Sequence, residues 1–193
     1  MVNDYLQTKS ANIYAVGDVA GPFQLTHAAA HQAWYAAVNG LFGRLKKFKT
    51  DYSVMPAAVY AYPEVARVGL NEKEAKQADI SYEITQYELN DLDRAIADDH
   101  DLGFVKVLTA TSSDKVLGAT IVGSHSGELL AEFILAMRYK LGLNNIIGTI
   151  HPYPTMSEAN KATAGMWKVN HAPQTLLSWV EKYFNWTRKK DLS

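Results

Sequence analysis

Residues 12–19 read Asn-Ile-Tyr-Ala-Val-Gly-Asp-Val and lie shortly before an alanine-rich stretch from His27 to Leu41. The apolar run 13–16 predicts a short buried strand, and Gly17 marks a tight turn at its end. Asp18 follows at the carboxyl end of that strand, where ligands bind in open α/β sheets. Thr26 is predicted to open the helix, whose first turn offers free backbone N–H groups to an electron-rich ligand atom. The sequence therefore predicts a strand, a ligand-binding turn and a helix.

The segment from Thr8 to Gly40 resembles the last flavin contact of the pyridine nucleotide–disulfide oxidoreductases, the family of dihydrolipoamide dehydrogenase, glutathione reductase and mercuric reductase. The resemblance implies that Asp18, after Gly17, binds the ribityl chain of FAD. It also implies that the backbone N–H groups at Leu25 and Thr26 face the flavin pyrimidine, where His27 is placed to touch the cofactor. The plainer alternative is a buried strand–turn–helix with a capping aspartate.

The composition is typical of a fragment of such an enzyme. The 193 residues contain no cysteine and no Gly-x-Gly-x-x-Gly loop, whereas a family member needs two such loops, for FAD and for NADH or NADPH, and usually a redox cysteine pair. We therefore expect the carboxyl-terminal third of a larger polypeptide, colourless and inactive by itself. The formal net charge of −1 argues against a nucleic-acid partner, and no apolar run is long enough to span a membrane. A cytoplasmic location without membrane contact is expected, and no metal site is predicted.

A charged segment at residues 44–51 separates the first part from a second domain. The expected division is a remnant of the FAD-binding domain at 1–50, a dimerisation domain at 51–171 and an amphipathic helical extension at 172–193. Strands are predicted at 57–61, 65–68, 82–89, 104–108 and 116–123, the last two joined by a hairpin. Asn71 is predicted to cap a helix ending near Gln77. Ser126 is predicted to cap a second helix through Leu141, with Gly142 as its C′ residue.

This pattern predicts an α+β fold, a mostly antiparallel sheet with flanking helices. The region from Val54 to Glu158 also resembles the family's dimerisation domain, so the resemblance implies a homodimer whose active sites each use both subunits. It further implies that the Tyr62-Pro63 and Tyr153-Pro154 peptides are cis.

The candidate catalytic segment is His151-Pro-Tyr-Pro-Thr-Met-Ser-Glu158. Many family members have His-x-His-Pro-Thr-x-x-Glu here, and their second histidine, the proton carrier, corresponds to Tyr153. A phenol with a pKa near 10 is a poor general base at neutral pH. Mercuric reductases resemble this chain in having tyrosine here. His151 is a second candidate and Glu158 a third, expected to orient one of the other two. The alternatives are a structural histidine, a packing aromatic and a helix-dipole acid.

After Pro173 the sequence continues with an apolar stripe that includes Leu176, Leu177, Val180 and Phe184, followed by three basic residues. Packing on the body or on a partner subunit is expected, with membrane contact as the alternative. The tail has none of the paired cysteines of mercuric reductases, so the small-molecule electron acceptor stays open. Two functions remain: part of a flavin-dependent oxidoreductase, or a stand-alone dimerisation module without activity.

Overall fold

The computed structural model describes residues 1–190, and for Gln174, Leu176, Lys189 and Lys190 it describes the backbone alone. Residues 191–193 of the expected extension, and the side chain of Leu176 in its stripe, therefore lie outside the described part. The chain divides into two compact units, Met1–Ala57 and the remainder from Ala58.

The first unit contains the short 3-10 turn η1 (Gly17–Val19) and the helix α1 (Thr26–Phe42). The prediction of α1 is confirmed. The predicted buried strand at 13–16 is wrong: Tyr14 forms an isolated antiparallel bridge with Gln7, and Ile13 is 53% exposed. A strand buried on both faces needs neighbouring strands on either side. In the first unit this run pairs with one side only, through the hydrogen bonds from Thr8 N to Ile13 O and from Ala15 N to Leu6 O.

Buried amides hold this unit together in place of a sheet. Asn39, near the end of α1, accepts a hydrogen bond from Phe48 N at 2.7 Å and donates to Phe48 O at 2.8 Å. Its Nδ2 atom also lies 3.3 Å from Tyr5 O. The side chain thereby fastens the segment after α1, and the start of the chain, to the helix.

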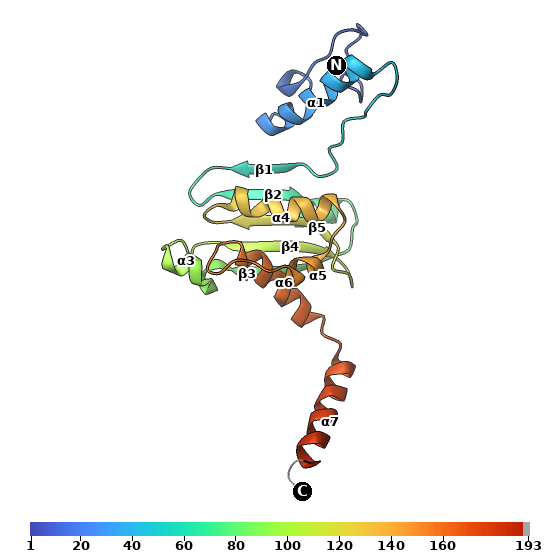
Figure 1. Ribbon diagram of the computed structural model, residues 1–193. Coiled ribbons are helices and arrows are strands. Elements are labelled where there is room, and N and C mark those ends of the chain that lie inside the picture. Colours follow the sequence, from blue (N-terminus) through green and yellow to red (C-terminus); the bar gives the residue numbers. More distant parts are fainter. Residues whose placement is uncertain (191–193) are drawn as a thin grey trace. The chain divides into compact units, whose positions relative to one another are not determined.

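The second unit is built on a five-stranded antiparallel sheet in the order β1-β2-β5-β4-β3 (Figure 1). The strands are β1 (Pro56–Val59), β2 (Val65–Gly69), β3 (Tyr82–Glu88), β4 (Phe104–Ala110) and β5 (Val116–Val122). β4 and β5 form the predicted hairpin, in which Val105 pairs with Ile121. The predicted α+β fold is confirmed.

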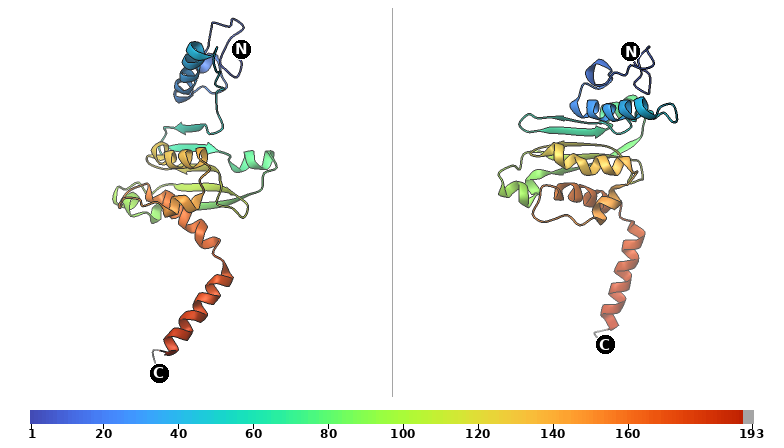
Figure 2. Two further views of the ribbon diagram at one scale, coloured as in Figure 1. Left: turned by 45° about the vertical axis from the view of Figure 1, so that its right-hand side comes forward. Right: turned by 45° about the horizontal axis from the view of Figure 1, so that its top comes forward.

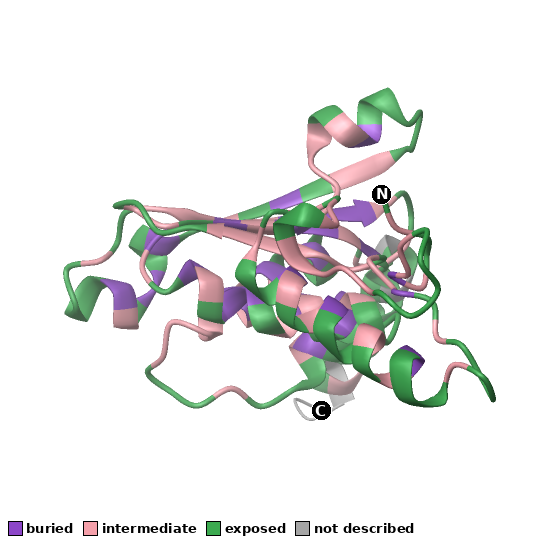
Figure 3. Cartoon of the chain, turned by 90° about the horizontal axis from the view of Figure 1, so that it is seen from above, coloured by how far each residue is buried: buried purple, intermediate pink, exposed green. Residues whose placement is uncertain are grey.

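Helices cover one face of this sheet. α4 (Ser126–Arg138) packs on β2 and β5, and α6 (Glu158–Asn170) packs on β3 and β4 beside α5 (Leu143–Gly148), as the views in Figures 1 and 2 agree. Three shorter elements, α2 (Glu72–Gln77), η2 (Leu89–Asp91) and α3 (Asp93–Ala97), occupy the connections. The core lies between the sheet and its helices and includes Phe133, Leu130, Ile121, Val107 and Val68. Figure 3 shows buried positions on strands and helices alike.

The helix ends show which capping predictions hold. Asn71 caps α2 as predicted, because its Oδ1 accepts from Glu74 N and the Glu74 carboxylate accepts from Asn71 N. The prediction for Ser126 is wrong. His125, with φ at +59°, is the N-cap residue of α4, and the Ser126 hydroxyl donates to Gly123 O at 2.6 Å. The serine therefore fastens the helix start to the end of β5.

The predicted end of α4 is also wrong. The helix ends at Arg138 and the left-handed residue after it is Lys140, with φ at +57°. Gly142 instead precedes α5, where its N–H donates to Asn145 Oδ1 at 3.1 Å. A Cβ at Gly142 would lie 2.2 Å from the Asp114 carboxylate, so a larger residue there would displace this carboxylate, which accepts hydrogen bonds from Asn144.

Two further predictions concern the backbone and the tail. The Tyr62-Pro63 and Tyr153-Pro154 peptides are cis, as expected, and Gly21-Pro22 is cis as well. The tail forms α7 (Gln174–Lys190), and its described apolar side chains are exposed instead of packed on the body: Trp179 is 72% exposed and Tyr183 59%. No helix among residues 1–190 is both long enough and apolar enough to cross a membrane.

Candidate functional site

The glycine turn before α1 is held from inside by one buried amide. Gly17 has φ at +75°, and a Cβ there would lie 3.4 Å from the Ala29 Cβ, so the turn passes close to the first turns of α1. The Gly17 N–H donates to Gln32 Oε1 at 2.6 Å. Gln32 is fully buried, and its Nε2 donates to Gly21 O at 2.8 Å and to the Tyr52 hydroxyl at 2.9 Å. Gln32 therefore fixes both ends of the loop from Gly17 to Gly21.

This turn leaves complementary polar groups on the surface. Asp18 is exposed, and so is Thr26 at the start of α1. The N-cap position of α1 is Leu25, and no side chain caps it, so the first backbone N–H groups are available to a ligand. A carboxylate beside free N–H donors matches the ribityl hydroxyls and the pyrimidine oxygen of FAD, the cofactor that the resemblance implies.

His27, the other predicted cofactor contact, is committed elsewhere in the first unit. Its Nε2 lies 2.9 Å from Pro56 O, and one turn later the Nε2 of His31 lies 3.0 Å from Asp51 O. Both imidazoles thus connect α1 to residues 51–56, the last part of the first unit. His27 is nevertheless exposed, as are Asp18 and Thr26.

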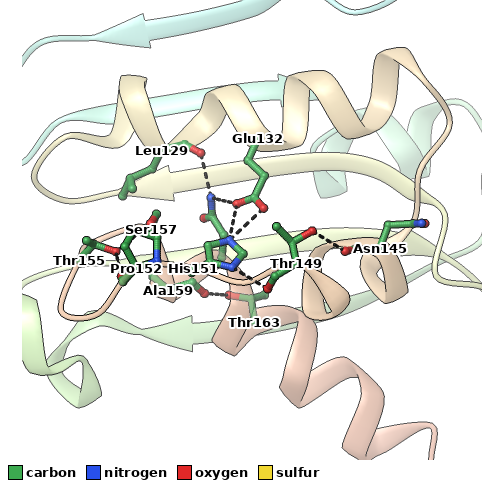
Figure 4. A network of polar contacts seen from close by, with 11 residues as sticks. Leu129, Glu132, Asn145, Thr149, His151, Pro152, Thr155, Ser157, Ala159 and Thr163 are labelled. Atoms are coloured by element: carbon green, nitrogen blue, oxygen red, sulfur yellow. Dashed lines mark hydrogen bonds and ion pairs between the residues drawn. The ribbon is translucent and has the colours of Figure 1, made fainter.

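In the second unit, His151 is part of a polar network with α4 and α6 (Figure 4). Its Nε2 lies 3.0 and 3.2 Å from the two carboxylate oxygens of Glu132, and its Nδ1 lies 3.2 Å from Thr149 O. The His151 side chain is 6% exposed. Asn160 completes the network by donating from Nδ2 to Leu129 O at 2.9 Å and to Glu132 Oε2 at 3.0 Å. The network joins the loop before α6 to the middle of α4.

Tyr153, unlike the buried His151, lies at the surface. It is 70% exposed and its hydroxyl donates to Asp93 Oδ2 at 2.9 Å. An open hollow of about 280 Å³ is lined there by Tyr87, Asp91, Leu92, Asp93, Tyr153, Glu158, Lys161 and Ala162. The hydrogen bond to Asp93 and the negative charge of that carboxylate raise the pKa of Tyr153 above its ordinary value, and Glu158 adds to the effect. Burial raises the pKa of Tyr87 in the same hollow.

Glu158 is the first residue of α6 and caps the turn before it. Its Oε2 accepts a hydrogen bond from Thr155 N at 3.1 Å. The structure therefore brings Tyr153 and Glu158 to one hollow, whereas the carboxylate that contacts His151 is Glu132. The two roles expected for Glu158 are that of a helix-terminal acid and that of a residue that orients Tyr153 or His151. Its contacts are those of a helix-terminal acid, and its charge also raises the pKa of Tyr153.

Four supporting residues escaped the sequence analysis: Gln32, Glu132, Asn160 and Asp93. Glu132 and Gln32 carried a weak signal, because each is a polar residue one turn from apolar positions of a predicted helix. Asp93 carried none, because it lies 60 residues from its partner Tyr153. Among the described residues, no group of three or more histidine, aspartate or glutamate side chains is arranged to hold a metal ion.

Residues 55–164 match the family model described as the pyridine nucleotide-disulphide oxidoreductase dimerisation domain. Among curated proteins, the chain is 37% identical over 172 residues to dihydrolipoyl dehydrogenase of Chlamydia muridarum, a match covering 88% of this chain and 36% of that protein. It is 40% identical over 160 residues to dihydrolipoyl dehydrogenase of Buchnera aphidicola, covering 82% and 33%. The chain thus spans about a third of the length of these relatives.

Solved structures agree in fold. LpdA of Mycobacterium tuberculosis superposes with a TM-score of 0.78 at 24% identity, covering 86% of this chain and 36% of that one. The HOCl-induced flavoprotein disulfide reductase RclA of Escherichia coli gives a TM-score of 0.77 at 25% identity, covering 86% and 38%. The sheet and its helices therefore have the same arrangement in these proteins.

Proposed function

Because the chain belongs to the pyridine nucleotide-disulphide oxidoreductase family, we propose that it supplies part of the flavin site and the dimer interface of an FAD-dependent NAD(P)H oxidoreductase. The observation that carries the proposal is the match of residues 55–164 to the family's dimerisation domain. It is supported by the turn at residues 17–26 earlier in the chain, where an exposed carboxylate precedes a helix start that no side chain caps. Members of the family use FAD and NAD(P)H, and their dimerisation domain builds homodimers. For this chain, the cofactors and the partner subunit are part of the proposal.

Bound FAD would supply the transfer of electrons from NADH or NADPH to a small acceptor. Asp18 would accept hydrogen bonds from the ribityl hydroxyls, and the N–H groups at Leu25 and Thr26 would donate to the pyrimidine, with His27 at the rim. Gln32 keeps this surface in place by holding Gly17 and Gly21. The chain's own contribution is thus to orient the flavin ring and not to bind its pyrophosphate.

At the second unit, Tyr153 would face the acceptor as a neutral hydroxyl. Its raised pKa opposes ionisation at physiological pH, so it acts as a hydrogen-bonding group and not as a base. Asp93 and Glu158 flank it in the same hollow. His151, with both ring nitrogens engaged by Glu132 and Thr149, would position the loop that carries Tyr153.

A chimaera tests the proposal. The matching third of the Buchnera aphidicola dihydrolipoyl dehydrogenase is replaced by this chain, and the purified protein is assayed for bound flavin, mass and NADH oxidation. We expect a dimer that retains FAD. Replacing Asp18 by Ala in the chimaera is expected to weaken FAD retention about tenfold, the effect of removing one strong hydrogen-bonding group. Asp101→Ala, at an exposed loop residue of the second unit, is the control.

The isolated chain is expected to purify without a visible flavin band, because it contains no glycine loop for the pyrophosphate. A folded, dimeric chimaera that holds no flavin would instead support the stand-alone dimerisation module. Stoichiometric flavin in the isolated chain would contradict the proposed division of the cofactor site.

A further inference from the structure

Helix α7 presents two adjacent apolar stripes to solvent. Leu177, Val180 and Phe184 follow one another at three- and four-residue spacing, and Trp179, Tyr183 and Trp186 form the neighbouring row. Every one of these side chains is at least 42% exposed. Two adjacent rows make an apolar face much broader than the narrow seam of a coiled coil.

The remaining face of α7 is basic. Lys182 and Arg188 lie there beside a single acid, Glu181, and the sequence continues with lysines at 189 and 190. The helix is therefore cationic, although the whole chain has a formal net charge of −1. A surface that covers the apolar face of this helix must also tolerate, or attract, positive charge at its border.

From this combination we propose that α7 lies in the plane of an anionic lipid surface, with its aromatic and aliphatic rows in the headgroup region and its basic residues against acidic headgroups. Tryptophan and tyrosine suit this depth, because each has an apolar ring and one polar atom. The helix is not apolar enough to cross the bilayer. It therefore lies on the surface.

Charge favours an anionic lipid surface over a second copy of α7 as the partner of this apolar face. Two copies packed in parallel through their apolar faces would bring both sets of basic residues to the same end of the pair, and like charges there repel. An antiparallel pair, which separates those ends, is tested by light scattering below. An anionic membrane complements the basic residues. The proposal is independent of the flavin site, because none of its residues belongs to that site or to the Tyr153 hollow.

The test uses the full 193-residue chain and sedimentation with lipid vesicles, in pure phosphatidylcholine and in phosphatidylcholine with roughly a third phosphatidylglycerol. We expect the acidic lipid to raise the partition coefficient about tenfold or more. High salt is expected to reverse most of that gain, since it screens the headgroup charge. A tryptophan emission shift to shorter wavelength on binding gives a second readout.

Two variants separate the contributions. Trp179→Glu with Phe184→Asp is expected to weaken binding to the acidic vesicles at least about tenfold, because it places charge in the apolar face. Lys182→Glu with Arg188→Glu is expected to remove the preference for acidic lipid and leave the apolar face intact. Trp34→Ala, at an exposed tryptophan of α1, is the matched control and is expected to bind as the unaltered chain does.

Binding that is absent, or unchanged in the Trp179/Phe184 variant, would overturn the proposal. Light scattering of the same variant gives the other decisive outcome. If the variant loses dimer mass while the unaltered chain ignores vesicles, the face belongs to a second copy of the chain. Circular dichroism checks that the variants keep the sheet, which is expected because Trp179 and Phe184 are exposed.

Discussion

The imidazole Nε2 of His151 lies 3.0 Å from Glu132 Oε1, across 19 residues of sequence. This contact turns the candidate catalytic histidine inward, to a network shared with Asn160, and leaves Tyr153 as the exposed side chain of the same loop. The two residues of one short motif thus have different roles: one holds the loop and the other faces solvent.

Replacing Glu132 by Ala is expected to lower the free energy of unfolding by about 2 kcal/mol, because His151 and Asn160 both lose a buried partner. Urea denaturation followed by circular dichroism measures the change. Glu128→Ala is the control on the same helix, since the Glu128 side chain is 84% exposed, and it is expected to cost less than about 0.5 kcal/mol. Equal effects of the two substitutions would contradict a structural role for the network.

Replacing Asp93 by Asn is expected to lower the pKa of Tyr153 toward its ordinary value of 10.0, because the variant removes the negative charge that disfavours the phenolate. The ionisation of this one tyrosine is obtained from ultraviolet titrations as the difference between each protein and its Tyr153→Phe counterpart. Asp98→Asn, at the C-cap of the same short helix, where the aspartate pairs with Arg94 and not with Tyr153, serves as the control. A Tyr153 titration unaffected by Asp93→Asn would show that the contact does not govern the phenol.

His171 is expected to make stability depend on pH. The hydrogen bond with Trp167 O, and then the contact with Glu83, raise the pKa of His171 above 6.5. The backbone N–H of Ser112 and the contact with His171 lower the pKa of Glu83 below 4.5. The contribution of His171 to folding stability is complete below pH 6.5 and is lost as pH rises through its raised pKa. The contribution of Glu83 is complete above pH 4.5 and is lost as pH falls through its lowered pKa.

Both contributions to stability, from His171 and from Glu83, are therefore present between pH 4.5 and pH 6.5. His171→Ala is expected to destabilise the chain more at pH 5.5 than at pH 8.5 by roughly 1 kcal/mol or less, since about a third of each side chain is exposed. Thermal denaturation at the two pH values measures this, with His125→Asn as the control at an exposed histidine with positive φ. A difference of the opposite sign would exclude the assigned protonation.

Replacing Gln32 by Leu is expected to cost about 2 to 3 kcal/mol, because the N–H of Gly17 and the carbonyl of Gly21 lose their buried partner at once. Proteolysis of the first unit, followed by mass spectrometry, measures local opening of the turn. Gln24→Leu is the exposed control. Retention of normal protease resistance would mean that packing alone holds the turn.

The chain is expected to form a homodimer with twice its mass of 21.4 kDa. The family's dimerisation domain implies this assembly, and the exposed apolar residues of the β1–β2 region, such as Val59 and Tyr60, need cover. Light scattering at tens of micromolar is the measurement. A monomer throughout that range would count against the expected interface.

The sequence alone determined most of the local structure and the fold. Apolar spacing specified the strands and the principal helices, and the Asn71–Glu74 pair specified a helix start, because these signals depend on neighbours within a few residues. The boundary of α4 was misjudged, because Ser126 and Gly142 are typical capping residues that tertiary contacts use for other purposes.

Only the tertiary structure decided the partners of the candidate site. Glu132 reaches His151 from α4, Asp93 reaches Tyr153 from α3, and Gln32 reaches back to Gly17, across separations that no periodicity encodes. The predicted strand at 13–16 failed for the related reason that burial on two faces depends on neighbouring strands and not on the run itself. Which side chain of the His151–Tyr153 pair faces solvent was therefore fixed by packing, since a sequence motif specifies residues but not the contacts that orient them.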